Sequence, residues 1–295
     1  MSVASRKDSA AGRPIGVFDS GLGGLTVVRQ LRRALPHEDF IYLGDTARVP
    51  YGTKSTAAVI QFSCEAGQFL MRQGVKAIVI ACNTATAWGL PTLERRFPAP
   101  IFGVVTPGAT AALRRSQSGR IGVIATPSTI RSGAYRKAIV ALDDQAQVFS
   151  QACPLLVPLV EEGWQNHPVT RLVLQEYLAP LTAERIDTLV LGCTHYPLLK
   201  TAIRRVVGHR IALVDSAASC AADVRAGLGK QGLLVERRRR KGSFEAYVTD
   251  DTPAFAKLCS RLLRLPPQQA RKAVLPPYEA QPSQARPEHD GLVAG

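Results

Sequence analysis

The sequence predicts an α/β protein made of two similar domains, each a doubly wound parallel sheet with helices on both faces. Short apolar runs alternate with helical patterns along most of the chain, which is typical of parallel sheets. The length of 295 residues corresponds to about two domains. Pro14–Ser20 (PIGVFDS) is also echoed by Arg120–Thr126 (RIGVIAT), which indicates two related lobes. Chance is the alternative, because buried parallel strands are all rich in Val, Ile and Gly.

The expected strands are short runs of β-branched and other apolar residues, and the expected helices are longer stretches with helical periodicity. Strands are expected at Ile15–Phe18, Phe40–Leu43, Ala77–Ala81, Ile101–Val104, Ile121–Ala125, Ala146–Phe149, Thr188–Leu191, Ile211–Val214 and Phe244–Val248. Helices are expected between them at Leu25–Leu35, Thr56–Arg72, Thr86–Arg96, Pro107–Arg115, Ser128–Ala141, Thr170–Pro180 and Pro197–Val207.

The order of these elements predicts the domain boundaries. The first domain is expected to span residues 12–105 and the second residues 106–209. Residues 210–265 are expected to return to the first domain, because one strand and its helices could not bury their apolar faces alone. Residues 266–295 contain six prolines and little apolar periodicity, so a disordered tail is expected there.

Composition narrows the class of protein. Hydrophobic residues make up 46% of the chain, but no apolar run is long enough to span a bilayer. The first residues, MSVASRKDSAAG, lack the apolar stretch of a signal peptide, so a cytoplasmic location without a membrane partner is expected. Six dispersed cysteines without a CxxC pair are expected to be free thiols. Cys193 and His195 have no second ligand pair at zinc-finger spacing, so no metal site is expected.

The net charge of +14 has a local and a distributed part. The local part is the uninterrupted run Arg237–Lys241, and the rest is spread over helix surfaces. We interpret both as solvated faces. Contact with nucleic acid or an acidic partner is the alternative. No aromatic-interleaved patch or recognition helix supports it, so a nucleic-acid partner is not expected.

Two cysteines occupy matching places in the two halves. Ala77–Thr84 reads AIVIACNT and Thr188–His195 reads TLVLGCTH, so Cys82 and Cys193 each follow a buried strand. Two thiols in matched settings suit a reaction in which a proton leaves one face of a carbon and returns to the other. Each also precedes an expected helix, whose dipole should favour the thiolate. The pattern therefore indicates a racemase.

Polar loops follow the first two strands, at the strand ends where open α/β sheets bind ligands. Asp19–Gly24 (DSGLGG) forms a glycine-rich turn that could hold a phosphate or only cap a helix. Gly44–Gly52 (GDTARVPYG) is long for a strand-to-helix connection, which favours a functional role.

The motifs together resemble the cofactor-independent glutamate racemases of the aspartate/glutamate racemase family. In order they are DSGLGGLTV, GDTARVPYG, ACNTAT, VEEGW, GCTHYPLL and DSA, covering roughly Pro14 to Ala217. The resemblance implies an active site in the cleft between the two domains and no cofactor. It also implies interconversion of L- and D-glutamate, which supplies D-glutamate for bacterial peptidoglycan. The basic run and the proline-rich tail depart from the family but lie outside the motifs.

The resemblance also implies catalytic roles. Cys82 would act on the D-glutamate face of the substrate and Cys193 on the L-glutamate face. Asp19 would assist the first thiol and His195 the second; a hydrogen-bonded core histidine is the alternative for His195. Glu161 would be a further acidic residue of the cleft, with its neighbour Glu162 as the alternative.

Short polar groups are implied to hold the substrate. Ten residues match the family's substrate-binding positions: Asp19, Ser20, Tyr51, Gly52, Asn83, Thr84, Thr126, Thr129, Thr194 and His195. The motifs contain few cationic side chains, so backbone N–H groups at turns and helix starts are expected to bind much of the carboxylate charge. The other cysteines, Cys64, Cys153, Cys220 and Cys259, are interpreted as small buried hydrophobes.

Other functions stay open on the sequence. A sister racemase acting on aspartate or a hydantoin would use the same thiol pair. A pyridoxal-phosphate racemase would need a Schiff-base lysine, and neither Lys54 nor Lys76 has a phosphate-site setting. A DNA- or topoisomerase-associated binding module would use the basic surface, and a secondary role toward DNA gyrase is credited to some members of the resembled family. A homodimer is a further expectation.

Overall fold

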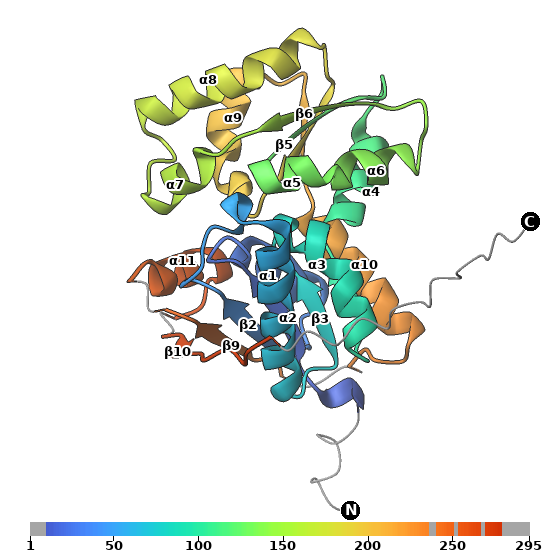
Figure 1. Cartoon of the computed structure of the whole chain (residues 1–295), viewed down its shortest axis with the longest axis vertical. Coiled ribbons are helices and arrows are strands. Elements are labelled where there is room, and N and C mark those ends of the chain that lie inside the picture. Colours follow the sequence, from blue (N-terminus) through green and yellow to red (C-terminus); the bar gives the residue numbers. More distant parts are fainter. Residues whose placement is uncertain (1–9, 236–239, 251–252, 267–268, 279–295) are drawn as a thin grey trace, which may run out of the picture.

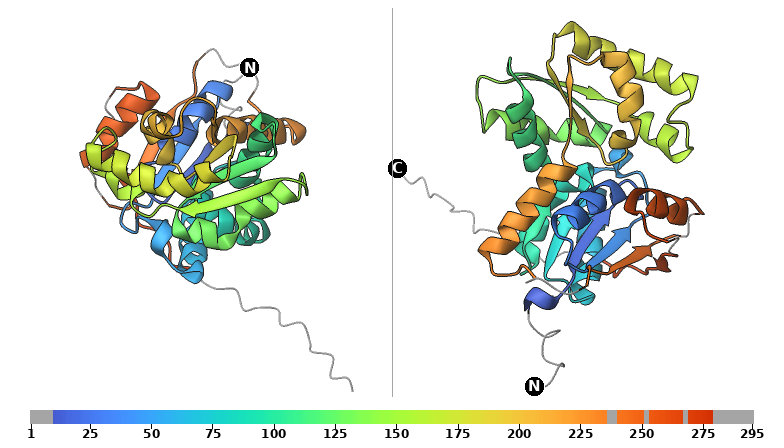
Figure 2. Two further views of the ribbon diagram at one scale, coloured as in Figure 1. Left: turned by 90° about the horizontal axis from the view of Figure 1, so that it is seen from above. Right: turned by 180° about the vertical axis from the view of Figure 1, so that it is seen from behind.

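Two α/β domains make up the described part of the chain, one above the other in Figure 1 and seen from two further sides in Figure 2. The structure is a computed structural model that describes residues 10–235, 240–250, 253–266 and 269–278. The chain crosses between the domains from β4 (Ile101–Gly103) to α4 (Val105–Arg115), and again from β8 (Ala212–Asp215) to α10 (Ala217–Lys230). The predicted fold class is confirmed.

The first domain contains a six-stranded parallel sheet with the order β10-β9-β2-β1-β3-β4. Besides β4, its strands are β1 (Ile15–Asp19), β2 (Phe40–Gly44), β3 (Ala77–Ile80), β9 (Phe244–Val248) and β10 (Arg271–Lys272). Besides α10, its helices are α1 (Leu25–Ala34), α2 (Thr56–Arg72), α3 (Asn83–Arg96), α11 (Pro253–Leu263) and short 3-10 turns at Ala10–Gly12 and Tyr51–Thr53. Val17 packs with α1, α10 and α11, whereas its neighbour Phe18 packs with α2 and α3. Successive strand residues face opposite sides, so β1 supplies both cores.

The second domain contains a four-stranded parallel sheet with the order β6-β5-β7-β8. Besides β8, its strands are β5 (Arg120–Ala125), β6 (Gln147–Ala152) and β7 (Thr188–Gly192). Besides α4, its helices are α5 (Pro127–Ser132), α6 (Ala134–Val140), α7 (Leu156–Glu161), α8 (Pro168–Ala183), a 3-10 turn at Tyr196–Leu199 and α9 (Lys200–Val207). The order β6-β5-β7-β8 repeats β2-β1-β3-β4 of the first domain. The two similar segments Pro14–Ser20 and Arg120–Thr126 therefore contain the equivalent strands β1 and β5. The strands that precede the two cysteines, β3 and β7, are also equivalent.

The expected start of the returning segment at residue 210 is wrong by one strand. β8 pairs with β7, with Leu189 opposite Leu213. Ile211 and Leu213 pack in the core of the second domain, so this strand completes the second sheet. The return to the first domain begins only with α10, which packs on α1.

Two of the expected helices differ in the structure because of their local backbone conformation. The helix expected over residues 128–141 is divided into α5 and α6 at Gly133, whose φ of +64° is left-handed and ends the first helix. The helix expected from Pro197 begins as a 3-10 turn and becomes α-helical only at Lys200.

Part of the expected disordered tail is docked. β10 pairs with β9, and Ala273, Leu275 and Tyr278 contact the α2–α3 core. The Tyr278 N–H donates to Glu65, and the Arg96 guanidinium lies over the Tyr278 ring. Proline removes N–H donors but does not prevent an extended segment from pairing at a sheet edge, and this edge position explains the error. The expectation for residues 279–295 falls outside the described residues.

One residue of the basic run Arg237–Lys241 forms an ion pair. The Arg240 guanidinium makes hydrogen bonds of 3.0 and 3.1 Å with the two carboxylate oxygens of Asp39. Arg237, Arg238 and Arg239 lie outside the described residues. Among the described helices, none has both the length and the apolar character needed to cross a bilayer.

Ending the chain at Leu265 is expected to lower its melting temperature by several degrees. This truncation removes the β10 pairing and the buried surface of Ala273, Leu275 and Tyr278, and burying one large apolar side chain contributes about 1.5–3 kcal/mol. A chain ending at Tyr278 keeps every contact described here and is the matched control for calorimetry. Equal melting temperatures for the two truncated chains would show that the docked segment adds no stability.

Candidate active site

The polar motifs meet in one small cavity between the domains, at the carboxyl ends of the strands. Ten of the sequence-predicted residues line it: Ser20, Tyr51, Gly52, Cys82, Asn83, Thr84, Thr126, Cys193, Thr194 and His195. Its volume of about 10 Å³ holds roughly one water molecule. The two domains pack closely around it, and an amino acid needs more space than this cavity offers.

Cys82 follows β3 and is the N-cap residue of α3. Its Sγ accepts a hydrogen bond from the Ala85 N–H at 3.5 Å and donates one to the Ser20 hydroxyl at 3.6 Å. Burial raises the pKa of Cys82 to about 12, with further contributions from the charges of Asp19 and Cys193. The expectation that the helix terminus would favour a thiolate is wrong here, because the cost of burying the charge exceeds the effect of the N–H donors. Cys82 is a neutral thiol at pH 7.

Cys193 follows β7 in the equivalent place, but the side chains around it differ from those around Cys82. A 3-10 turn begins at Tyr196, three residues after Cys193, and continues into α9 only at Lys200. Its Sγ lies 3.9 Å from His195 Nδ1, and His195 Nε2 lies 3.2 Å from Glu161 Oε1. Burial lowers the pKa of His195, but the contacts with Cys193 and Glu161 outweigh burial and raise it to about 10. Cys193 therefore faces a positively charged imidazolium at neutral pH.

Asp19 lies behind the cavity wall, at the end of β1, and is fully buried. Its carboxylate accepts hydrogen bonds from Gly21 N–H at 3.2 Å, Gly24 N–H at 3.0 Å and the Thr194 hydroxyl at 3.3 Å. Burial nonetheless raises the pKa of Asp19. The glycine-rich turn thus wraps around the protein's own carboxylate and leads directly into α1, which agrees with its helix-terminus interpretation.

Gly23 in this turn sets how closely the domains approach. A Cβ atom at Gly23 would lie 2.4 Å from Thr194 Oγ1 and 2.7 Å from His195 Nδ1. A Cβ at Gly52 would likewise lie 2.5 Å from Thr126. Both glycines therefore permit first-domain backbone to contact second-domain side chains that line the cavity.

Three threonine hydroxyls join the domains on the other side of the cavity. Thr84, the second residue of α3, Thr126, the N-cap of α5, and Thr129 form a triangle with all three Oγ1 separations at 2.9 Å. Asn83 Oδ1 accepts a hydrogen bond of 2.6 Å from the Tyr135 hydroxyl. Asn83 and Thr84 open α3, so their N–H groups have no partner within the helix and are suited to an anion.

The loop before Tyr51 is held by a charged network. The Tyr51 hydroxyl donates to Asp45 at 2.5 Å, and Arg48 pairs with both Asp45 and Glu65. Glu65 also accepts the hydrogen bond from Tyr278. The docked C-terminal segment and the cavity wall therefore share one network, in which the Tyr51 hydroxyl is engaged by Asp45.

The remaining predicted residues support the lining from behind. Asp19, Thr129 and Glu161 do not line the cavity but each bonds to a residue that does. Pro50 and Val157 do line it and were not among the predicted residues. Pro50 belongs to the long loop singled out in the sequence, whereas Val157 on α7 carries no polar group that could have marked it.

The other thiols are structural. Cys64, Cys153, Cys220 and Cys259 are buried in apolar cores, as interpreted from the sequence, and all six cysteines are free. Burial raises the pKa of Cys220 to about 12 and of Cys259 to about 11. Within the described part of the chain, no group of three His, Cys, Asp or Glu side chains is arranged to hold a metal ion.

The raised pKa of His195 predicts a dependence of stability on pH. The folded protein holds this proton with a pKa of about 10, against 6.5 for the free side chain. The resulting stabilisation is complete below pH 6.5 and is lost as the pH rises through about 10. We expect the difference in melting temperature between the wild type and His195→Asn to shrink steadily over this range. A difference that stays constant between pH 6 and pH 10 would contradict a protonated His195.

Comparisons with known proteins agree with this geometry. The sequence model of the family described as Asp/Glu/hydantoin racemase matches residues 15–224. A glutamate racemase from Syntrophus aciditrophicus is 50% identical over 257 residues, covering 87% of this chain and 95% of the relative. The glutamate racemase RacE1 structure from Bacillus anthracis superposes with a TM-score of 0.83 at 38% identity, covering 90% of this chain and 97% of the other. The Francisella tularensis enzyme, solved with D-glutamate, has a TM-score of 0.83 at 37% identity, covering 90% and 98%.

Proposed function

The chain belongs to the Asp/Glu/hydantoin racemase family, and from this premise we propose that it interconverts L- and D-glutamate by proton transfer between Cys82 and Cys193. One observation carries the proposal: two thiols from equivalent strand ends line the same cavity, one from each domain. An α-carbon held between them can lose its proton to one sulfur and gain a proton from the other. Inversion of configuration follows from that geometry.

The unequal surroundings of the two thiols favour one resting state. The imidazolium of His195 stabilises negative charge on Cys193, which suits this sulfur as the base toward L-glutamate. Cys82, with a pKa of about 12, is the protonated partner that delivers a proton to the opposite face. One turnover to D-glutamate leaves Cys193 as a thiol and Cys82 as a thiolate. The reverse reaction starts from this second state, and exchange of one proton with water restores the first.

Asp19 and Glu161 are proposed to act through the groups they contact. Glu161 supports the charge on His195 across the 3.2 Å contact. Asp19 lies near Cys82, and its charge raises the pKa of that thiol. A proton on Asp19, favoured by its burial, would ease formation of the Cys82 thiolate in the reverse direction. Both are thus positioning and electrostatic groups in this account.

Backbone and hydroxyl groups are proposed to hold the substrate. The first N–H groups of α3, at Asn83 and Thr84, can bind a carboxylate and stabilise the charge that grows there as the α-proton leaves. Ser20, Thr126 and Thr194 supply hydroxyls that line the same space, and Thr129 positions the hydroxyls of Thr84 and Thr126 from behind. Proton transfer between thiols uses no cofactor, and the relatives at about 50% identity are glutamate racemases, which favours glutamate over aspartate or a hydantoin.

The wider role follows from the activity. We propose that D-glutamate from this reaction enters peptidoglycan synthesis in the cytoplasm. Formation of a homodimer stays a prediction, which light scattering of the purified chain will test.

Circular dichroism of L-glutamate incubated with the purified, dialysed protein tests the activity. We expect the signal of 10 mM L-glutamate to decay to zero, and the signal of D-glutamate to decay to the same end point. L-aspartate serves as the matched substrate, with turnover expected to be at least about 100-fold slower because its side-chain carboxylate is one methylene shorter. No decay with glutamate, or faster decay with aspartate, would contradict the proposed substrate.

A further inference from the structure

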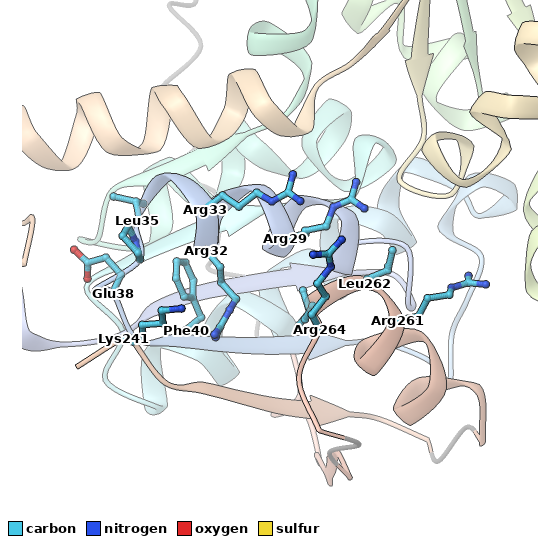
Figure 3. Close-up of a pocket in the computed structure, with 13 residues that line it drawn as sticks. Arg29, Arg32, Arg33, Leu35, Glu38, Phe40, Lys241, Arg261, Leu262 and Arg264 are labelled. Atoms are coloured by element: carbon cyan, nitrogen blue, oxygen red, sulfur yellow. The ribbon is translucent and has the colours of Figure 1, made fainter. Parts of the chain in front are cut away.

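A second cavity, of about 400 Å³, lies in the first domain between α1, α11 and the start of β2 (Figure 3). Six basic side chains line it: Arg29, Arg32, Arg33, Lys241, Arg261 and Arg264. Leu35, Phe40 and Leu262 supply its apolar part. Its lining extends along α1 from Arg29, in the middle of this ten-residue helix, to the carboxyl end, and it shares no residue with the lining of the active-site cavity. It is therefore separate from the active site.

The positive charge of this cavity is not neutralised within the described residues. Glu38 is the one acidic residue of its lining. The Glu38 carboxylate already binds Lys76 Nζ at 2.5 Å and the Val235 N–H at 2.8 Å. Arg29 Nε and Arg32 Nη1 are buried and have no hydrogen-bond partner in the described structure. Buried polar groups normally have a hydrogen-bond partner, so a bound anion could supply the acceptor that these two nitrogens lack.

Three of the six basic side chains, two on α1 and one just after α11, point toward one region of the cavity. The Arg32 guanidinium instead lies over the Phe244 ring, 5.7 Å from its centroid. Figure 3 shows Arg29 and Arg33 on α1 and Arg264 after α11 with their side chains directed into the same region. Arg264 adopts a φ of +54°, a left-handed conformation that is unfavourable for a residue with a Cβ. Burial also lowers the pKa of the Arg32 guanidinium. Arg33, Lys241, Arg261 and Arg264 are exposed, and an anion between them would offset the mutual repulsion of these charges.

We propose that this cavity binds a compact anion carrying two or more phosphate groups. The planar fork of a guanidinium matches phosphate oxygens and forms two parallel charge-assisted hydrogen bonds. Six cations around one cavity require more charge than a single phosphate brings. The volume of about 400 Å³ lies within the usual range for small-molecule sites. The ligand class is therefore an oligophosphate, either free or as part of a nucleotide.

Isothermal titration of the full-length protein with inorganic pyrophosphate in 150 mM NaCl tests this proposal. We expect saturable binding at micromolar pyrophosphate and at least about tenfold weaker binding by Arg264→Gly. Glycine tolerates a φ of +54°, so this variant should keep its melting temperature. Arg33→Gln, which keeps a good helix former in α1, should weaken binding to a similar extent. Arg205→Ala is the matched control, because it removes one exposed arginine from the last turn of α9 in the other domain.

A second titration with ATP distinguishes the two sources of phosphate. ATP binding that is lost with Arg264→Gly identifies a nucleotide site, whereas binding of pyrophosphate alone identifies a site for free oligophosphate. Equal affinity of the wild type and Arg264→Gly, or absence of binding by both ligands at 1 mM, would overturn the proposal. Heat of binding is the readout, so the result does not depend on glutamate racemisation.

Discussion

Replacing either Cys82 or Cys193 by alanine is expected to abolish racemisation of glutamate. Each variant removes one of the two groups that exchange protons with the α-carbon, and general acid or base catalysis contributes typically about 10²–10⁴-fold to a rate. We expect kcat to fall by at least this factor in both directions, because each thiol acts as base in one direction and as acid in the other. Polarimetry or circular dichroism with each enantiomer as the starting substrate measures both rates.

Cys64→Ala and Cys259→Ala are the matched controls. Both side chains are also buried free thiols of the first domain, but they lie in its apolar cores. They should lower the melting temperature without reducing turnover more than about twofold, since neither contacts the cavity. Substantial racemisation by Cys82→Ala or Cys193→Ala would contradict a role for both thiols.

The second large effect is expected from Gly23→Ala. An alanine Cβ would lie within 3 Å of Thr194 and His195 across the domain boundary. The backbone of Gly23 does not adopt a positive φ, so alanine is compatible with its conformation and the first domain should still fold. The domains would close less completely and misplace His195 and its partner Cys193. A displacement of about 1 Å in such a site can cost roughly 10²-fold in rate.

Gly229→Ala is the control for this variant. Gly229 lies in α10, where an added Cβ would meet only the end of the Leu234 side chain at 3.4 Å, and alanine favours a helix. Measuring kcat/KM and the melting temperature of both variants distinguishes an effect on domain closure, which lowers kcat/KM, from an effect on folding, which lowers the melting temperature. Gly23→Ala with wild-type kcat/KM would show that the closed arrangement is not needed for the reaction.

The parts of the site that depend on local pattern could be predicted from the sequence. Cys82 and Cys193 follow runs whose β-branched residues predict buried parallel strands, and the carboxyl ends of such strands meet at one edge. The motif residues around them were brought together as expected, with Ser20, Asn83, Thr194 and His195 in one cavity.

What could not be predicted depends on contacts between distant residues. Ala212–Asp215 reads like any buried strand, and only its pairing with β7 places it in the second sheet. The docking of Tyr278 on Glu65 joins residues more than 200 positions apart. The helix N-terminus at Cys82 is visible in the sequence, whereas the burial that outweighs it and raises the pKa of this thiol is not.

The fate of the α-proton tests the two-thiol account most directly. Ordinary L-glutamate is converted in D₂O by the wild type, and both enantiomers are isolated at early times for mass spectrometry. The account predicts that D-glutamate carries deuterium at Cα from the first turnover, because its new proton comes from Cys82, which has exchanged with solvent. The remaining L-glutamate should stay largely protonated. D-glutamate that retains the original proton would show transfer by a single group and would contradict the central claim.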